Sequence, residues 1–137
     1  MDQRISLVTL AVRDVAASRR FYLDGLGWET AFDADDVVMI QVGPHLVLSL
    51  WDEEAFEAEV GPIGRGQGVA PITLAHNCPT RAGVDAVLVT ARAAGADPVE
   101  AAQDRAWGGY SGYFGDPDGY RWEVAWNPGP IGRLVLP

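Results

Sequence analysis

Few side chains in this 137-residue sequence are of types that do chemistry on their own. The chain has one cysteine and no lysine, so a Schiff base and a lysine nucleophile are excluded. Cys78 closely follows His76, but Pro79 and the end of a predicted strand argue against a catalytic dyad, and we expect an idle or buried thiol. The sequence contains no nucleophile-elbow pattern and no phosphate-binding loop. The carboxylates and aromatic side chains are therefore the remaining candidates.

Two aromatic residues flank a pair of glycines in Trp107-Gly108-Gly109-Tyr110. Glycines let the backbone pass close to another group, and aromatic rings offer flat, rigid surfaces to a ligand. This segment is either the rim of a binding site or a turn with packed aromatic side chains. We expect three further tryptophans to face a helix-covered core and not a site, by strict alternation along their strands; they are Trp51, Trp122 and Trp126.

The elements that must position these residues occur in one order, twice. In the first half a strand over 5–12 precedes a helix over 15–23, which Asp14 can cap. Three strands are predicted over 28–32, 37–42 and 46–51, with a turn over 33–36, and a short acidic helix over 52–59 follows.

The glycine-rich segment 61–68 is predicted to be a linker, after which the order restarts. A strand over 70–77 leads to a helix that Thr80 can cap and that ends at Gly95. Strands follow over 97–101, 110–114 and 121–126, with a tight turn between the last two. We therefore predict one α+β domain of two tandem βαβββ modules, module one over 1–60 and module two over 69–137, sharing a core.

Two stretches resemble the vicinal oxygen chelate superfamily, which comprises glyoxalases, bleomycin-resistance proteins and dioxygenases. They run from Val12-Arg13-Asp14 through Arg20-Phe21-Tyr22 to Leu26-Gly27-Trp28, and from Tyr113 through Asp116-Pro117-Asp118-Gly119 to Glu123-Val124. The resemblance implies paired modules with curled mixed sheets that form a cavity, and a homodimer.

The resemblance also implies where metal-dependent members hold their ligands, on the first and last strand of each module. Glu123 matches the last-strand carboxylate, and the internal repeat puts its counterpart at Leu48. The first-strand positions fall at Leu7 and Pro71. One carboxylate cannot hold a catalytic divalent ion, so we expect no metal and no cofactor. His76 lies an odd number of residues from Pro71 and should face the other side of the sheet.

The predicted binding site has Glu123 as its one acidic group, with Arg121 two residues away as its possible partner. The full set of predicted ligand-binding residues is Leu7, Leu48, Asn77, Trp107, Tyr110, Arg121 and Glu123.

The formal net charge of −9 argues against nucleic acid, which needs a basic footprint. An acidic field could attract a cationic ligand, or it could serve only solubility. No apolar run long enough to span a membrane and no signal peptide is visible, and the single cysteine is typical of a reducing compartment. We therefore expect a cytoplasmic protein that does not act on membranes.

Two functions stay open at this point. The first is a metal-free small-molecule binding protein of the drug-sequestering type, with a cationic or aromatic ligand in an aromatic-lined cavity. The second is a metal-independent enzyme, a lyase or isomerase of the glyoxalase or dioxygenase type, with Glu123 as its general base. The sequence does not decide whether a reaction is catalysed.

Overall fold

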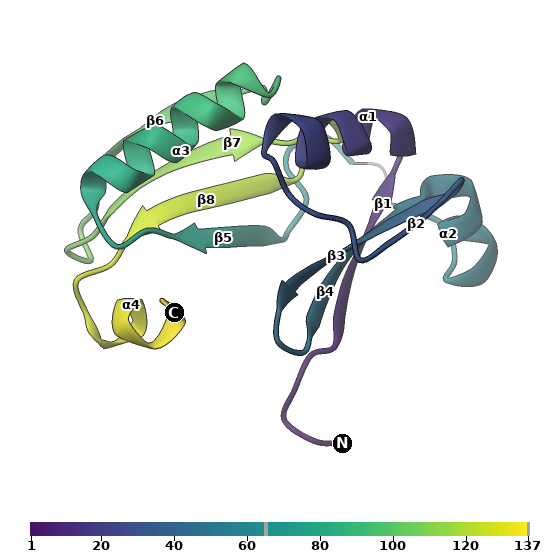
Figure 1. The fold of residues 1–137 in the computed structure, drawn as a ribbon, viewed down its shortest axis with the longest axis horizontal. Helices are drawn as coiled ribbons and strands as arrows, with labels where there is room; N and C mark the ends of the chain where they lie inside the picture. Colours follow the sequence, from purple (N-terminus) through teal and green to yellow (C-terminus); the bar gives the residue numbers. More distant parts are fainter. Residues whose placement is uncertain (65, 137) are drawn as a thin grey trace. The chain divides into compact units, whose positions relative to one another are not determined.

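The computed structural model describes residues 1–64 and 66–136, and Arg65 of the predicted linker and Pro137 of module two lie outside this description. The chain divides into two compact units, Met1–Gln67 and Gly68–Pro137, and each is described by itself. Both units contain a four-stranded mixed sheet with a helix against it (Figure 1). The predicted α+β class with two modules of the same element order is confirmed.

The first unit has a sheet in the order β1-β4-β3-β2, with β1 parallel to β4 and the other pairs antiparallel. The bounds of its elements are β1 Leu7–Val12, α1 Val15–Arg19, the π-helical η1 Arg20–Gly25, β2 Phe32–Ala34, β3 Val37–Gly43, β4 Leu46–Asp52 and α2 Glu53–Glu59.

The predicted helix over 15–23 is two elements in the structure. Asp14 caps α1 as expected, and its Oδ1 accepts a hydrogen bond from the backbone N–H of Ala17 at 3.0 Å. The chain then widens into the π-helical turn, which buries Phe21 and Tyr22 with their rings edge to face, 5.0 Å apart. These two rings anchor the helical segment to the core of the first unit.

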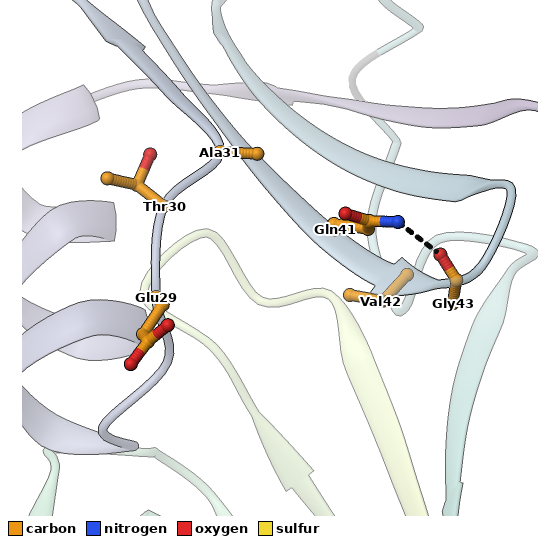
Figure 2. Close-up of a pocket in the computed structure, with 6 residues that line it drawn as sticks. All are labelled: Glu29, Thr30, Ala31, Gln41, Val42 and Gly43. Carbon is orange, nitrogen blue, oxygen red and sulfur yellow. Dashed lines mark hydrogen bonds between the residues drawn. The ribbon is translucent and has the colours of Figure 1, made fainter.

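A hollow of about 430 Å³ lies beside the end of β3, where the pairing with β4 shifts its register (Figure 2). Its lining residues come from the segment before β2 and from β3; they are Glu29, Thr30, Ala31, Gln41, Val42 and Gly43. The Gln41 amide donates a hydrogen bond to the carbonyl oxygen of Gly43 at 3.2 Å, so two of the lining residues are bonded to each other.

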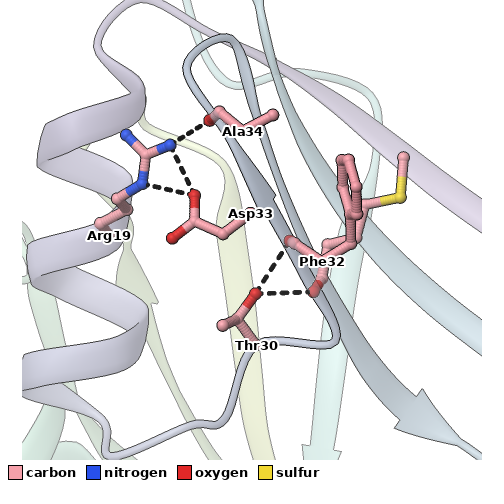
Figure 3. A network of polar contacts seen from close by, with 6 residues as sticks. Arg19, Thr30, Phe32, Asp33 and Ala34 are labelled. Atoms are coloured by element: carbon pink, nitrogen blue, oxygen red, sulfur yellow. Dashed lines mark hydrogen bonds and ion pairs between the residues drawn. The ribbon is translucent and has the colours of Figure 1, made fainter.

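Strand β2 lies later in the chain than the predicted strand over 28–32, and the prediction of a turn over all of 33–36 is wrong. Asp33 accepts hydrogen bonds from the Arg19 guanidinium, at 2.8 Å from Nε and 2.6 Å from Nη2 (Figure 3). The same guanidinium also donates to the carbonyl oxygen of Ala34. Trp28 instead packs beside Tyr22, with ring centroids 5.5 Å apart. Arg19 thus fixes β2 against α1.

The second unit has a sheet in the order β5-β8-β7-β6, with β5 parallel to β8 and the other pairs antiparallel. The bounds of its elements are β5 Thr73–Asn77, α3 Arg81–Ala93, β6 Val99–Asp104, β7 Tyr110–Gly115, β8 Arg121–Trp126 and α4 Pro130–Val135. The short helix α4 was not predicted from the sequence.

Helix α3 covers one face of the second sheet (Figure 1). Thr80 caps it as predicted, because its hydroxyl oxygen accepts from the N–H of Gly83 at 3.1 Å. The apolar stripe of the helix is buried at Val84, Leu88 and Ala91. On the sheet, Phe114 and Trp122 stack with centroids 6.1 Å apart. This face is the core of the second unit, and the opposite face carries Glu123.

No helix in the described part of the chain is long and apolar enough to cross a membrane.

Candidate functional site

The turn between β7 and β8 sets which residues share a face with Glu123. Asp116 is 4 % exposed, and its Oδ1 accepts hydrogen bonds from the N–H groups of Asp118 at 3.0 Å and Tyr120 at 2.9 Å. Gly119 completes the turn with φ +88°, a conformation that favours glycine. The turn brings Tyr113 directly opposite Glu123.

We call the sheet surface that carries Glu123 the Glu123 face. Paired residues in a sheet point to the same side, so the strand registers define its members. They are Thr73, Ala75 and Asn77 of β5, Arg121, Glu123 and Ala125 of β8, Ser111, Tyr113 and Gly115 of β7, and Glu100 and Gln103 of β6.

Glu123 is held by Tyr113, whose hydroxyl donates a hydrogen bond to Oε1 at 3.0 Å. Both side chains are half-buried. Burial raises the pKa of the Tyr113 phenol, and the hydrogen bond to Glu123 and the charge of Glu123 raise it further. The phenol therefore keeps its proton at neutral pH and donates a hydrogen bond to the carboxylate.

Arg105 reaches onto the same face from the loop between β6 and β7. Its Nε donates to Oγ of Ser111 at 3.0 Å, and its Nη2 donates to the Ser111 carbonyl oxygen at 3.0 Å. Its guanidinium carbon lies 5.4 Å from the centroid of the Tyr113 ring, within cation–π range. Arg105 therefore supports Tyr113, which in turn holds Glu123.

The indole of Trp107 lies against Gly109, which precedes β7. A Cβ atom at Gly109 would lie only 1.6 Å from Cζ3 of the indole, so glycine is required for this arrangement. The indole remains 53 % exposed. Alternation along the chain puts position 109 on the side of Ser111 and Tyr113, so Trp107 borders the Glu123 face.

Arg121 lies across from Gly115 on the Glu123 face. A Cβ at Gly115 would lie 2.7 Å from Nη1 of Arg121, so the missing side chain makes room for the guanidinium. Among the described residues, the Arg121 side chain forms no hydrogen bond and no ion pair, so it is not the partner of Glu123.

The second unit brings together four of the seven predicted ligand-binding residues, namely Glu123, Arg121, Asn77 and, at the border, Trp107. Tyr110 points to the other face, where its hydroxyl donates to Oδ1 of Asp85 on α3 at 2.8 Å. The guanidinium carbon of Arg81 lies 4.2 Å from the centroid of the Tyr110 ring. Leu7 lies in the first unit at the start of β1 and is 49 % exposed.

The placement of Leu48 on the cavity side is corrected by the structure. Leu48 is 2 % exposed and pairs with Val8 and Ile40, on the core face of the first sheet. The neighbouring residue, Ser49, points to the opposite face. A slip of one residue moves every side chain of a strand to the other face, and the internal repeat that gave Leu48 was aligned one residue off.

The strand registers identify the true counterparts. Ala11 and Asn77 occupy the same place in the two units, because each lies three residues before the residue that caps the next helix. Ala11 pairs with Trp51 of β4, and Asn77 pairs with Ala125 of β8, so Trp51 and Ala125 are counterparts. Two residues earlier on the same strands are Ser49 and Glu123, which are therefore counterparts as well.

The strand registers correct two further sequence predictions. Trp51 lies on the face of Ser49 and contacts Phe56 of α2 edge to face, so grouping it with Trp122 and Trp126 was wrong. Pro71 precedes β5, and Ala75 is the residue opposite Glu123.

The sequence analysis missed Tyr113, Arg105 and Ser111 as members of the site. One signal could have found Tyr113, because positions 113 and 123 are equally distant from Asp118 in the turn, and a regular hairpin pairs them. Arg105 comes from an irregular loop, and no spacing rule predicts its reach.

The remaining residues of chemical interest lie apart from Glu123. His76 pairs with Val124 and so faces away from Glu123, as predicted. His45 is exposed in the turn before β4. Cys78 is 3 % exposed, and burial raises the pKa of its thiol, so it stays protonated and a poor nucleophile.

The side chains around Glu123 do not fit a divalent metal ion. Its neighbours on the face include Arg121, which repels a cation, and Ala75, which has no donor atom. In residues 1–64 and 66–136, no group of three or more His, Cys, Asp or Glu side chains is placed to hold a metal. A divalent site needs several such donors, so we derive no chemistry from one.

The hollow of Figure 2 contains none of the predicted site residues. Glu29 is its one titratable side chain, and it lies in a different unit from Glu123. Its polar lining is largely engaged locally, since the Thr30 hydroxyl donates to the Phe32 carbonyl oxygen at 2.8 Å. The Glu123 face is therefore the better candidate site.

Comparisons with known proteins agree with this fold. Residues 4–124 match the family model Glyoxalase/Bleomycin resistance protein/Dioxygenase superfamily. A glyoxalase-related enzyme from Fulvimarina pelagi is 32 % identical, with a TM-score of 0.83, over 92 % of this chain and 89 % of that one. Lactoylglutathione lyase from Agrobacterium tumefaciens is 27 % identical, with a TM-score of 0.70, over 98 % of both chains.

A glyoxalase/bleomycin resistance protein/dioxygenase from Nocardioides is 23 % identical, with a TM-score of 0.77, over 94 % of this chain and 89 % of that one. No curated protein matches the sequence.

Proposed function

Because the chain belongs to the glyoxalase/bleomycin resistance protein/dioxygenase superfamily, we propose that it is a metal-free small-molecule binding protein whose ligand contacts the Glu123 face. The observation that carries the proposal is the carboxylate of Glu123, held by the Tyr113 hydroxyl at 3.0 Å on the sheet face that α3 leaves uncovered. A pre-positioned polar group on a half-buried surface is typical of ligand sites. Drug sequestration, as in bleomycin-resistance proteins, is the activity of this kind that needs no reaction.

The surroundings of Glu123 favour binding over metal chemistry. Its carboxylate shares the face with Arg121 and with the supported phenol of Tyr113, and the exposed indole of Trp107 borders it. Most members of this surface are polar. It offers a charge of each sign and a flat ring to a small molecule.

The test is isothermal titration calorimetry with four probes, namely ethidium, metal-free bleomycin, indole and 3-hydroxybenzoate. We expect at least one to bind, and Glu123→Gln to weaken that binding by about 1–3 kcal/mol, the range for a hydrogen bond to a charged group. Glu29→Gln, which removes the carboxylate of the Figure 2 hollow, is the matched control and should bind as the wild type does.

The proposal fails if none of the four probes binds. It also fails if Glu29→Gln weakens binding while Glu123→Gln does not, because the ligand would then occupy the hollow.

A second function is favoured by the 32 % identity to a glyoxalase-related enzyme and by the fixed orientation of Glu123. In this alternative the protein is a metal-independent lyase or isomerase, and the free oxygen of Glu123 removes a proton from the substrate. S-lactoylglutathione is the probe, after the related lactoylglutathione lyase. Turnover that Glu123→Gln abolishes while binding persists would establish that the protein is an enzyme. An absence of turnover would favour the binding function.

A further inference from the structure

Building on the proposed binding at the Glu123 face, we propose that the ligand is a small carboxylic acid that also carries a hydrogen-bond donor. Arg121 binds its carboxylate, and Glu123 accepts its donor. This class differs from the cationic ligand expected from the net charge of the chain.

Arg121 is the first part of the argument. Its guanidinium is half-buried on the Glu123 face and lies over the strand at Gly115, where no Cβ obstructs it. It has no hydrogen-bond or ion-pair partner in the described part of the chain. A guanidinium offers five N–H donors in a planar fork that matches a carboxylate, so an organic acid is its natural partner.

Glu123 is the second part. The Tyr113 hydroxyl donates one hydrogen bond to Oε1 of Glu123. A carboxylate has about four lone-pair sites, so further sites remain for a hydroxyl or amine of the ligand. Because the Tyr113 pKa is raised by burial and by Glu123, the phenol stays a donor and leaves Glu123 as the acceptor of the pair.

The spacing of these two groups limits the size of the ligand. Arg121 and Glu123 lie two residues apart on β8, so their Cα atoms are separated by about 7 Å. They do not pair with each other among the described residues. A ligand that contacts both therefore carries its carboxylate and its donor a few ångströms apart, as in a hydroxybenzoate.

The other charges on the face do not neutralise Arg121. Arg105 is committed to Ser111, with two hydrogen bonds of 3.0 Å. Glu100 is exposed on β6, opposite Tyr113, and is two strands away from β8, or about 10 Å. No salt bridge in the described residues joins Arg121 to a carboxylate, that of the neighbouring Asp97 included, so its positive charge remains available to an anion.

The test is calorimetry of the full-length chain with 3-hydroxybenzoate, benzoate and 3-hydroxybenzamide. Benzoate lacks the donor, and 3-hydroxybenzamide lacks the charge. We expect 3-hydroxybenzoate to bind about tenfold or more tightly than either analogue, because each loses one charge-assisted hydrogen bond.

Variants locate the contacts. Arg121→Met should weaken 3-hydroxybenzoate about tenfold or more, and Arg121→Lys should restore part of the affinity because it keeps the charge. Glu123→Gln should reduce the preference for 3-hydroxybenzoate over benzoate. Arg92→Met, on the covered side of the sheet in α3, is the matched control and should bind as the wild type does. Circular dichroism of each variant checks that it folds. If Arg121→Met does not fold, Arg121→Lys is the variant that is compared with the wild type.

Equal affinity for 3-hydroxybenzoate and 3-hydroxybenzamide would overturn the inference, as would unchanged binding in Arg121→Met. If ethidium or bleomycin binds through Glu123 while the acids do not, this inference is wrong and the proposed function stands. If no probe binds, both are wrong.

Discussion

At the scale of single residues, Tyr113 and Glu123 form a hydrogen-bonded pair. The phenol donates to the carboxylate at 3.0 Å, and the carboxylate in turn raises the pKa of the phenol. Burial is the larger cause of that raised pKa. The pair can therefore be followed by the titration of Tyr113.

We predict that Glu123→Gln lowers the pKa of Tyr113 toward its ordinary value. The shift should be incomplete, because the burial of the phenol remains. Phenolate absorbance measures the titration, and the difference between each protein and its Tyr113→Phe counterpart assigns it to this residue. An identical Tyr113 titration in wild type and Glu123→Gln would show that the pair does not form in solution.

The same pair predicts how stability responds to alkaline pH. A folded-state pKa above 10.0, the ordinary value, means that the folded chain keeps a proton that the unfolded chain releases. This contribution is fully present below pH 10 and is lost as the pH rises from there through the folded-state pKa. Thermal melts above pH 10 should therefore show a smaller loss of stability in Tyr113→Phe than in wild type. Cys78 acts in the same direction in both proteins and cancels. An equal loss in both would contradict the assignment.

Part of the site could be predicted from the sequence. Glu123 and Arg121 follow from their place in a regular strand, whose bounds were predicted correctly as 121–126. The partner of Glu123 was missed because Arg121 is nearer in sequence, whereas the hairpin register makes Tyr113 nearer in space. Leu48 was misplaced because the internal repeat, aligned from sequence alone, does not resolve a shift of one residue.

At the scale of elements, Gly112 in strand β7 and Gly109 just before it lie on opposite faces of the sheet. On the α3 side, a Cβ at Gly112 would lie 2.6 Å from Leu88 and 2.7 Å from the backbone oxygen of Glu100. On the Glu123 side, the three atoms nearest to a Cβ at Gly109, just before the strand, all belong to the far ring of the Trp107 indole. Backbone atoms cannot move aside, but an exposed indole can.

We therefore predict unequal losses of stability for two glycine-to-alanine changes. Gly112→Ala should lower the free energy of unfolding by about 1–3 kcal/mol, the range for overpacking a core. Gly109→Ala should cost less than about 1 kcal/mol and should shift tryptophan emission as the indole moves into solvent. In a Trp107→Phe background, Gly109→Ala should leave the emission unchanged. Urea denaturation and fluorescence measure both effects, and a larger loss in Gly109→Ala than in Gly112→Ala would refute this account.

The order of the elements was readable because polar turns and capping residues separate them. Asp14 and Thr80 cap helices as predicted, and the βαβββ order occurs in both units. Strand β2 was displaced because its position depends on the contacts of Arg19 with Asp33, which lie 14 residues apart. The π-helical turn after α1 likewise depends on burying Phe21 and Tyr22, and the spacing of apolar residues in this segment does not predict that turn.

At the scale of the whole molecule, the acidic balance of 19 acidic to 10 basic residues does not describe the candidate site. Arg105 and Arg121 are two of those ten basic residues, and both lie on or reach the Glu123 face. The net charge of −9 therefore bears on solubility and long-range attraction, whereas the local charges determine the class of ligand.

We predict that the protein is a homodimer, as the family resemblance implies, because two-fold symmetric dimers are the commonest homo-oligomers. Sedimentation equilibrium at micromolar concentration should give twice the chain mass of 14.7 kDa. A mass of one chain across that concentration range would contradict the prediction.

The last prediction concerns metal. Glu123 stands next to Arg121, which repels a cation, and opposite Ala75, which has no donor atom. In the part of the chain that the structure describes, no group of three or more His, Cys, Asp or Glu side chains is placed to hold a metal. A Ni²⁺, Zn²⁺, Fe²⁺ or Mn²⁺ site needs several such donors. Elemental analysis of the purified protein should therefore find well under one equivalent of any of these metals, and a chelator should leave its melting temperature unchanged. A stoichiometric metal that Glu123→Gln removes would show that Glu123 is a ligand after all.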